Sequence, residues 1–270
     1  MKLKIFIISL LVFSGLISCN KSDNSEFTDT PIVEAYLTPG QVPVVKVRRQ
    51  IPFSSGISYS SDSLNNLNVK IINNNTTYNL VCVGDTEYVD SSLLIQEGQR
   101  YDLSFTFNNK TVSAYTNVPA RPASFTESVS SIALQKVDST SGFQYGTMPD
   151  PISLTWDNSD GSYYIVIIEN MESTLVAIRS FGSHQPPGNR FRTAPTTASG
   201  LELRPMEFQY FGKHRLILYH VLPDYAALYN QQESSSLNLT NPSTSITNGY
   251  GIFTALNSDT LYVDVIQASK

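Results

Sequence analysis

The chain has 270 residues, of which 41% are hydrophobic and 15% are charged, and its formal net charge is −5. This apolar content can form a buried core, and the low charge excludes a charged coiled coil or a highly charged disordered chain. The acidic balance excludes a nucleic-acid partner, because phosphate backbones are bound by clustered lysine and arginine side chains.

Residues 1–18 have the pattern of a signal peptide. Lys2 and Lys4 precede an apolar run of 13 residues, which is shorter than the roughly 20 needed to span a bilayer. The run ends in Leu16-Ile17-Ser18-Cys19, which resembles the lipobox of bacterial lipoproteins. We therefore expect cleavage before Cys19 and acylation of its sulfur, with palmitate as a typical acyl chain. The alternative is an ordinary signal peptide followed by an incidental cysteine.

Residues 19–30 predict a flexible tether between the lipid and the fold. The segment is polar and carries three acids, Asp23, Glu26 and Asp29, a composition that does not form a core. It loosely resembles the acidic export signal of surface lipoproteins in Bacteroidota, although its acids are spread out. Loss of Lys2 and Lys4 on cleavage changes the net charge from −5 to −7.

Residues 31–118 predict an N-terminal β-sandwich. The alternation of Tyr101, Leu103, Phe105 and Phe107 with polar residues indicates a half-buried strand. Cys82 is expected to be a small core residue. Short strands separated by turn signals are typical of antiparallel sandwiches. We expect strands at 32–37, 44–49, 69–72, 78–83, 101–107 and 111–118.

Residues 119–122 contain two prolines and predict a stiff linker to a second domain over residues 123–270. The strand that carries Trp156, the turn after it and the strand at 163–169 resemble the B–C region of fibronectin type III domains, where the tryptophan lies in the core. The fold class is thus mainly β, with two antiparallel immunoglobulin- or fibronectin III-like sandwiches. One short helix is expected at 223–232, which begins with proline. Further strands are expected at 125–137, 174–180, 201–210, 214–221, 251–256 and 261–266.

Several segments together resemble a family of Bacteroidota lipoproteins catalogued as domain of unknown function 4249. The resemblance implies no catalytic residues. It implies an outer-membrane location and a TonB-dependent β-barrel receptor as partner. The segments are the lipobox, residues 31–37, the Val118-Pro119 junction, residues 223–229, and residues 247–255 followed by 258–261.

Motifs of common enzymes and nucleotide-binding sites are missing from the sequence. His214 and His220 lie six positions apart in a predicted strand, about 20 Å, which is too far to share a metal ion. Residues 157–161 do not match the spacing of a calcium loop and predict a turn. We therefore expect neither enzymatic activity, a cofactor nor a metal. A hydrolase with a site assembled from distant segments is the least favoured alternative.

Residues 173–201 contain no acid, which is unusual in an acidic chain. Their centre, residues 180–200, predicts a long loop, and such loops are often functional. Arginine beside aromatic side chains can bind an anionic or sugar ligand or anchor a protein interface. The alternative is a solvated loop without a ligand. The candidate binding residues are Phe181, His184, Arg190, Phe191 and Arg192.

Three short motifs, at 62–64, 138–140 and 259–261, match the Asp-Ser/Thr-apolar pattern of O-glycosylation in Bacteroidota, the second only loosely because Thr140 is not strongly apolar. The first two lie in predicted loops, so Ser63 and Ser139 are the candidate acceptors. Motifs of three residues also arise by chance.

These features predict a lipid-anchored outer-membrane protein, on the cell surface rather than the periplasmic face. Its expected role is a non-catalytic binding or accessory subunit of a TonB-dependent transporter. The second hypothesis is a free-standing surface adhesin for a glycan or peptide ligand, with the 180–200 loop as its binding surface.

Overall fold

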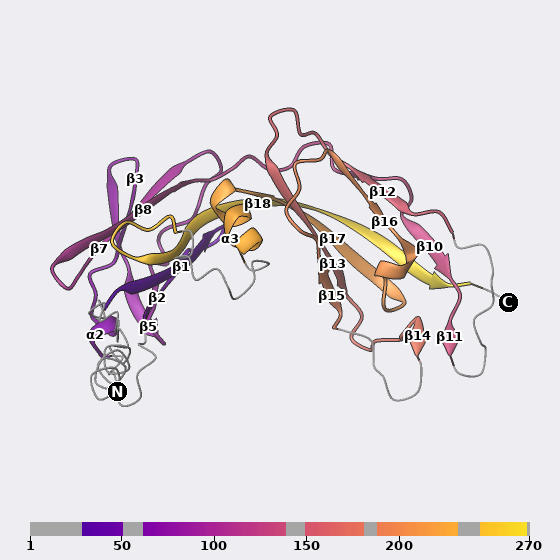
Figure 1. The fold of residues 1–270 in the computed structure, drawn as a ribbon, viewed down its shortest axis with the longest axis horizontal. Coiled ribbons are helices and arrows are strands. Elements are labelled where there is room, and N and C mark those ends of the chain that lie inside the picture. The colour runs from indigo at the N-terminus through magenta and orange to yellow at the C-terminus, as the bar shows by residue number, and fades with distance from the viewer. Residues whose placement is uncertain (1–28, 51–61, 139–148, 181–187, 232–243, 269–270) are drawn as a thin grey trace, which may run out of the picture.

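A computed structural model describes residues 29–50, 62–138, 149–180, 188–231 and 244–268. The fold is mainly β, with antiparallel sheets and a short helix in the second half, so the predicted fold class is confirmed. Figure 1 shows two β-sandwiches side by side, with the C-terminal strand running through both. Among the described residues, no helix combines the length and apolarity that a bilayer crossing requires.

The first sandwich packs the sheet β4-β3-β7-β8 against the strands β1, β2, β6 and β5. Its core contains alternate residues of each strand, as in β7, where Tyr101, Leu103, Phe105 and Phe107 are all buried. The elements are β1 (Pro31–Leu37), β2 (Val44–Arg49), α2 (Asp62–Asn65), β3 (Lys70–Asn73), β4 (Thr76–Asn79), β5 (Val81–Gly84), β6 (Glu87–Val89), β7 (Arg100–Phe107) and β8 (Lys110–Asn117).

The second sandwich packs the sheet β16-β12-β9 against β15-β13-β17-β18 and β10. The elements are β9 (Thr126–Glu127), β10 (Ser131–Leu134), β11 (Val137–Asp138), β12 (Ile152–Thr155), β13 (Tyr163–Asn170), β14 (Arg179–Ser180), β15 (Arg190–Arg192), β16 (Gly200–Leu203), the 3-10 helix η2 (Pro205–Glu207), β17 (Gly212–Val221), α3 (Pro223–Gln231) and β18 (Tyr250–Gln267). Trp156 is 3% exposed between the two sheets, as the fibronectin III resemblance implies.

Strand β18 joins the two sandwiches into one nine-stranded sheet. Its first half pairs in parallel with β1, and its second half pairs with β17. Phe253 and Ala255 lie in the first core, whereas Val263 and Val265 lie in the second. All four are odd-numbered, so both cores lie on the same side of the strand. From the sequence we expected two short strands here, at 251–256 and 261–266, both within a separate second domain. The structure has one continuous strand, because residues 257–260 pair with β17. Local sequence patterns do not reveal this pairing, since β17 is distant in the chain.

Gly251 allows the junction to form. Its φ is +97°, and a Cβ there would collide with the carbonyl oxygen of Val33 on β1. Four of the segments that carry the family resemblance meet at this junction, namely β1, the start of β18, α3 and the Val118-Pro119 segment. The Pro119 carbonyl accepts a hydrogen bond from Asn257 at 3.0 Å. The linker is also held to β18 by an ion pair of 2.6 Å between Arg121 and Asp259.

Four predicted elements differ from the structure. The strand expected at 78–83 is divided between β4 and β5, and the one expected at 125–137 is divided among β9, β10 and β11. Within the strand expected at 174–180, residues 179–180 pair with β11 and Ala177 forms a single bridge to Tyr210. The strand expected at 201–210 ends at Leu203 and is followed by η2. Pairing with different partner strands, which local periodicity does not encode, accounts for these divisions. For example, β4 pairs with β3 whereas β5 pairs with β6, and β9, β10 and β11 pair with β12, β18 and β14.

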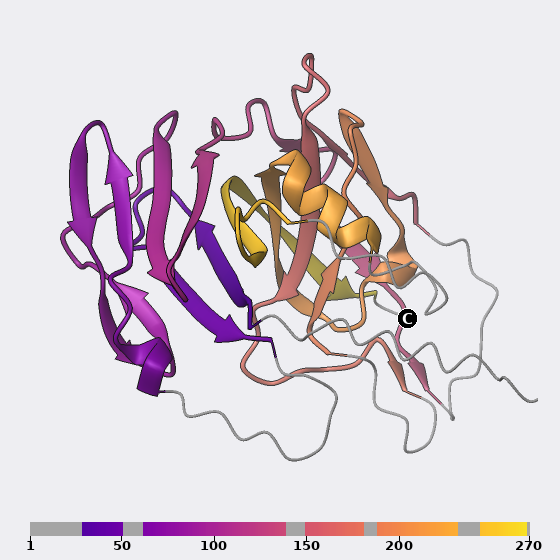
Figure 2. The same cartoon turned by 60° about the vertical axis from the view of Figure 1, so that its left-hand side comes forward.

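Strands β13 and β17 are covered on both faces. One face packs in the second core, and the other forms a smaller apolar cluster of Ile165, Ile167, Ile217 and Val221. Helix α3 lies across this second face (Figure 2), with Tyr225 packed against the cluster. Asp224 holds the helix in place, because its Oδ1 accepts a hydrogen bond of 2.9 Å from Thr254 of β18.

Candidate functional site

A groove with a volume of about 180 Å³ lies between α3 and the outer face of the nine-stranded sheet. Its floor is apolar, because alternate residues of the two-sided strands point outward. Its rim carries two arginines from β15 and three tyrosines. The lining residues are Tyr36, Ile165, Ile167, Arg190, Arg192, Tyr219, Val221, Tyr225 and Leu256.

Strand β15 positions both arginines. We expected a loop over 180–200, but residues 190–192 are a strand that pairs with β13, with Arg192 opposite Ile167 and Arg190 opposite Glu169. Residues directly opposite each other in a sheet share a face. Both guanidinium groups therefore stand on the groove side, two positions apart. The loop prediction failed because this strand is only three residues long and gains order from its pairing with β13.

The guanidinium of Arg192 is held by two tyrosines of α3. Its Nη1 donates a hydrogen bond of 3.1 Å to the Tyr225 hydroxyl, and it lies 5.0 Å from the centre of the Tyr229 ring. Such a cation–π contact fixes a side chain that would otherwise be mobile. Tyr225 in turn packs edge-on against Tyr36, with ring centres 6.1 Å apart. Arg192 is thus pre-organised while it stays exposed.

Two acids on the strands that form the groove have basic partners. Glu169 forms an ion pair with Arg215 at 2.5 Å. Glu34 lies 3.7 Å from Arg48. Within the part of the chain that the structure describes, no ion pair involves Arg190 or Arg192. Burial, together with the nearby Glu34 and Tyr225, raises the pKa of the Tyr36 phenol, so this hydroxyl remains a hydrogen-bond donor.

The other candidates from the acid-free segment are not brought into this groove. Phe191 stands on the opposite face of β15, where it lines a smaller cavity beside His214. Phe181 and His184 lie outside the described residues. Arg179 has a structural role, because its Nη2 donates hydrogen bonds to the carbonyl oxygens of Met206 and Phe208. The predicted set is therefore reduced to Arg190 and Arg192 at the groove.

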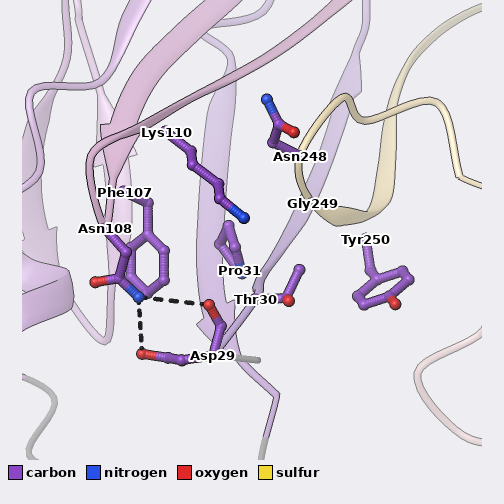
Figure 3. Close-up of a pocket in the computed structure, with 9 residues that line it drawn as sticks. All are labelled: Asp29, Thr30, Pro31, Phe107, Asn108, Lys110, Asn248, Gly249 and Tyr250. Atoms are coloured by element: carbon purple, nitrogen blue, oxygen red, sulfur yellow. Dashed lines mark hydrogen bonds between the residues drawn. The ribbon is translucent and has the colours of Figure 1, made fainter. Parts of the chain in front are cut away.

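A second cavity, of about 310 Å³, lies where the predicted tether enters the fold. Asn108 donates hydrogen bonds to the backbone oxygen and the carboxylate of Asp29 (Figure 3). The same carboxylate pairs with Arg49 at 3.2 Å. The lining is mixed polar and apolar, and its carboxylate already has partners. These contacts fix Asp29, near the end of the predicted tether, against the turn between β7 and β8 and against β2. The lining residues are Asp29, Thr30, Pro31, Phe107, Asn108, Lys110, Asn248, Gly249 and Tyr250.

The two histidines of β17 have separate partners. His214 is 3% exposed, with Nε2 3.3 Å from the Asn170 amide and Nδ1 3.0 Å from the Gly212 carbonyl. His220 stacks on Tyr164 with ring centres 4.9 Å apart. Burial lowers the pKa of His214, which favours its neutral form.

Of the three residues predicted to be modified, Cys19, Ser63 and Ser139, the structure describes one. Cys19 and Ser139 lie outside the described residues, and Ser63 belongs to the short helix α2. Cys82 was expected in the core. It is partly buried against the first core, and its thiol lies 3.6 Å from the Asn65 side-chain oxygen.

The sequence did not identify the tyrosines of the groove. Tyr36, Tyr219 and Tyr225 come from β1, β17 and α3, which are distant in sequence. The sequence predicts the helix that carries Tyr225, but nothing in it links this helix to the arginines. The unusual feature that could have indicated the groove is the run of apolar residues on both faces of β13, which signals a second contact surface.

The groove lining suits binding by charge and aromatic contact. Its described residues include neither a carboxylate nor a serine, cysteine or histidine that could act as a nucleophile or general base. Two exposed arginines beside tyrosines are typical of contact sites for anions and proteins.

Comparison with protein-family models gives a match to the family described as Domain of unknown function (DUF4249), over residues 21–261. The matched range includes both sandwiches and ends within β18. No curated protein matches the chain at a significant level.

Proposed function

The chain belongs to the DUF4249 family, and from this premise we propose that it is a non-catalytic binding subunit anchored to a bacterial outer membrane. The proposal extends to a Bacteroidota origin and to the cell surface as location. The supporting sequence features are the Leu16-Ile17-Ser18-Cys19 lipobox and the polar tether. Acyl chains on Cys19 supply attachment, because two or more chains hold a protein stably at a bilayer.

The observation that carries the binding role is the groove. Arg190 and Arg192 stand exposed over an apolar floor, in a chain whose net charge is −5. Exposed arginines and partly exposed tyrosines beside buried isoleucines resemble the composition of interface hot spots. The proposed partner is a TonB-dependent β-barrel transporter, which this surface contacts.

Lipidation is tested by growing the native host with an alkyne-tagged fatty acid. We expect the wild-type chain to carry the tag and to sediment with outer membranes, and Cys19→Ser to lose both properties. An untagged wild-type protein would contradict the anchor. Protease treatment of intact cells then reports the leaflet, because only a surface-exposed chain is digested.

The partner is tested by cross-linking and affinity purification from native membranes. A barrel receptor should co-purify with the wild-type chain and be reduced at least about tenfold with Arg190→Ala combined with Arg192→Ala. Arg100→Ala, which changes an exposed arginine far from the groove, is the matched control. Recovery without a barrel protein would contradict the transporter role, and a specific signal on a glycan or peptide array would instead support a free-standing adhesin.

O-glycosylation at Ser63 and Ser139 is a separate part of the proposal. Intact-mass measurement of the natively expressed protein should show added glycan mass that Ser63→Ala and Ser139→Ala remove. An unmodified mass would dismiss it.

A further inference from the structure

We infer that the groove binds a carboxylate that carries an apolar group, such as the C-terminus of a peptide ending in leucine. This deepens the proposed binding role by naming the chemical class of the ligand. The arginine rim provides the contacts for the carboxylate, and the isoleucine and valine floor provides the contacts for the apolar group.

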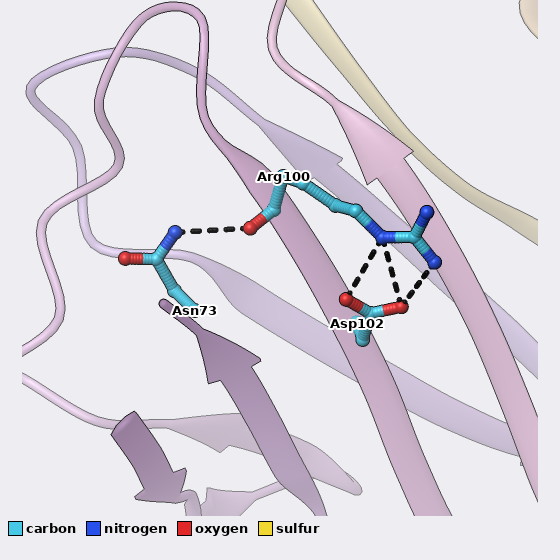
Figure 4. A network of polar contacts seen from close by, with 3 residues as sticks. All are labelled: Asn73, Arg100 and Asp102. Atoms are coloured by element: carbon cyan, nitrogen blue, oxygen red, sulfur yellow. Dashed lines mark hydrogen bonds and ion pairs between the residues drawn. The ribbon is translucent and has the colours of Figure 1, made fainter. Parts of the chain in front are cut away.

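The first half of the molecule contains an arginine that stacks on a tyrosine and also pairs with a carboxylate, and this carboxylate is what the groove lacks among its described lining residues. Arg100 lies 4.2 Å from the centre of the Tyr115 ring, much as Arg192 lies 5.0 Å from that of Tyr229. Arg100 is neutralised by Asp102, which accepts hydrogen bonds from Nη2 at 2.7 Å and from Nε at 3.0 Å (Figure 4). Arg192 has the same aromatic support, and its ion-pair partner is absent among the described residues. A ligand carboxylate at Arg192 would take the place that Asp102 takes at Arg100.

The charges around the groove favour an external anion. Glu169 and Glu34 are paired with Arg215 and Arg48. Asp224, at the start of α3, accepts hydrogen bonds from Thr254 and from the Tyr225 backbone. Arg190 and Arg192 stand on one face of a strand, two positions apart, which is about 6.6 Å. A carboxylate between them can accept charge-assisted hydrogen bonds from both guanidinium groups, and such bonds are about twice as strong as neutral ones.

The floor sets the size of the apolar group. The outward faces of Ile165, Ile167 and Val221 form a cavity of about 180 Å³ with the arginine rim. A cavity of about 150 Å³ is sufficient for benzene. The groove therefore has room for one side chain of the size of leucine or phenylalanine. A hydrophilic anion such as inorganic phosphate would make no apolar contact with this floor.

The test uses the chain from residue 19 onward with Cys19→Ser, and calorimetry or saturation-transfer NMR with two matched probes. N-acetyl-L-leucine carries the carboxylate, and N-acetyl-L-leucinamide differs from it only at that group. We expect the acid to bind at least about tenfold more tightly than the amide, with an affinity that falls as salt is added. Arg190→Gln combined with Arg192→Gln should reduce acid binding to the level of the amide.

Arg100→Gln is the control, because it removes an arginine stacked on tyrosine outside the groove. It should leave acid binding unchanged, and circular dichroism verifies that each variant is folded. Equal binding of acid and amide, no binding of the acid, or equal loss with Arg100→Gln would each overturn the inference. Binding of N-acetyl-leucine but not of 4-methylpentanoate identifies a peptide terminus as the source, and binding of both identifies apolar acids in general. The assay contains neither membrane nor partner, so its result is independent of the co-purification experiment.

Discussion

The two halves of the nine-stranded sheet differ in what covers their outer face. In the first half this face is charged, with Lys46 and Glu87 paired at 2.6 Å. In the second half the same face presents Ile165, Ile167, Ile217 and Val221, and α3 covers part of it. Both halves already have a core on the other side, so the second apolar face is not needed to close a sandwich. The groove is therefore formed by apolar side chains that neither core requires.

The largest effect is expected where the two halves join. Gly251→Val places a side chain against the Val33 carbonyl at a φ of +97°. Backbone strain and steric overlap each cost about 1–3 kcal/mol, so we expect a loss of about 2–6 kcal/mol in the free energy of unfolding, measured by urea denaturation.

The control for the junction is Gly188→Ala, whose added Cβ has no neighbour within 4 Å. It should change the free energy of unfolding by less than about 0.5 kcal/mol. Wild-type stability of Gly251→Val would show that the two halves do not depend on the pairing of β1 with β18.

A pair of neighbouring isoleucines separates the two faces of β13. Ile168 points into the second core and Ile167 toward the groove, and they are 3% and 7% exposed. Ile168→Ala should cost about 3 kcal/mol, because a closed core retains the cavity. Ile167→Ala should cost about half as much, because its space opens into the groove. Equal losses in urea denaturation would mean that the groove side is packed like a core.

As the pH falls, the second sandwich should lose stability before the first. The buried polar side chains around the first core include Thr86 and Thr116, whereas the second core buries His214. Burial lowers the pKa of His214 below its unfolded value, so the unfolded chain binds more protons between the two values. The stability from the neutral ring is complete above the unfolded pKa, near 6.5, and is lost as the pH falls through the window below it.

Hydrogen exchange measures this difference. Between pH 7.5 and pH 5.5, after correction for intrinsic rates, protection should fall more in β13 and β17 than in β7 and β8. His214→Gln should reduce the difference. A uniform fall in both halves would contradict the assignment to His214.

The smallest effect is expected at the start of α3. Burial raises the pKa of Asp224, so the folded state binds more protons above the unfolded value near 3.9. Stability from this group is therefore complete at low pH and decreases as the pH rises through the folded pKa. Asp224→Asn retains an acceptor for Thr254 and Tyr225, so we expect a change below about 0.5 kcal/mol at pH 7.

Asp224→Ala is the matched variant, because it removes both hydrogen bonds and should cost about 1 kcal/mol in thermal or urea unfolding. A larger loss for Asp224→Asn than for Asp224→Ala would show that the negative charge itself holds the helix.

Local patterns were sufficient to predict much of the fold. The alternation in β7 and the apolar strand β1 predict their own boundaries within one residue, and proline predicts the start of α3. These strand predictions are reliable because successive side chains of a strand point to opposite faces, so alternation in the sequence gives the alternation of burial directly. The absence of acids from residues 173–201 also indicated Arg190 and Arg192 as candidate binding residues, although it placed them in a loop and not in a strand.

The groove could not be predicted, because its residues come from five strands and a helix that meet only in the folded chain. Composition and periodicity predict a mainly β chain with alternating strands, a short helix and two arginines in a segment without acids. The folded chain shows in addition that β18 serves both cores, that β15 is a strand, and that tyrosines of α3 hold Arg192. These features depend on strand pairing and cation–π contacts with partners far away in the chain, whereas periodicity and composition are local.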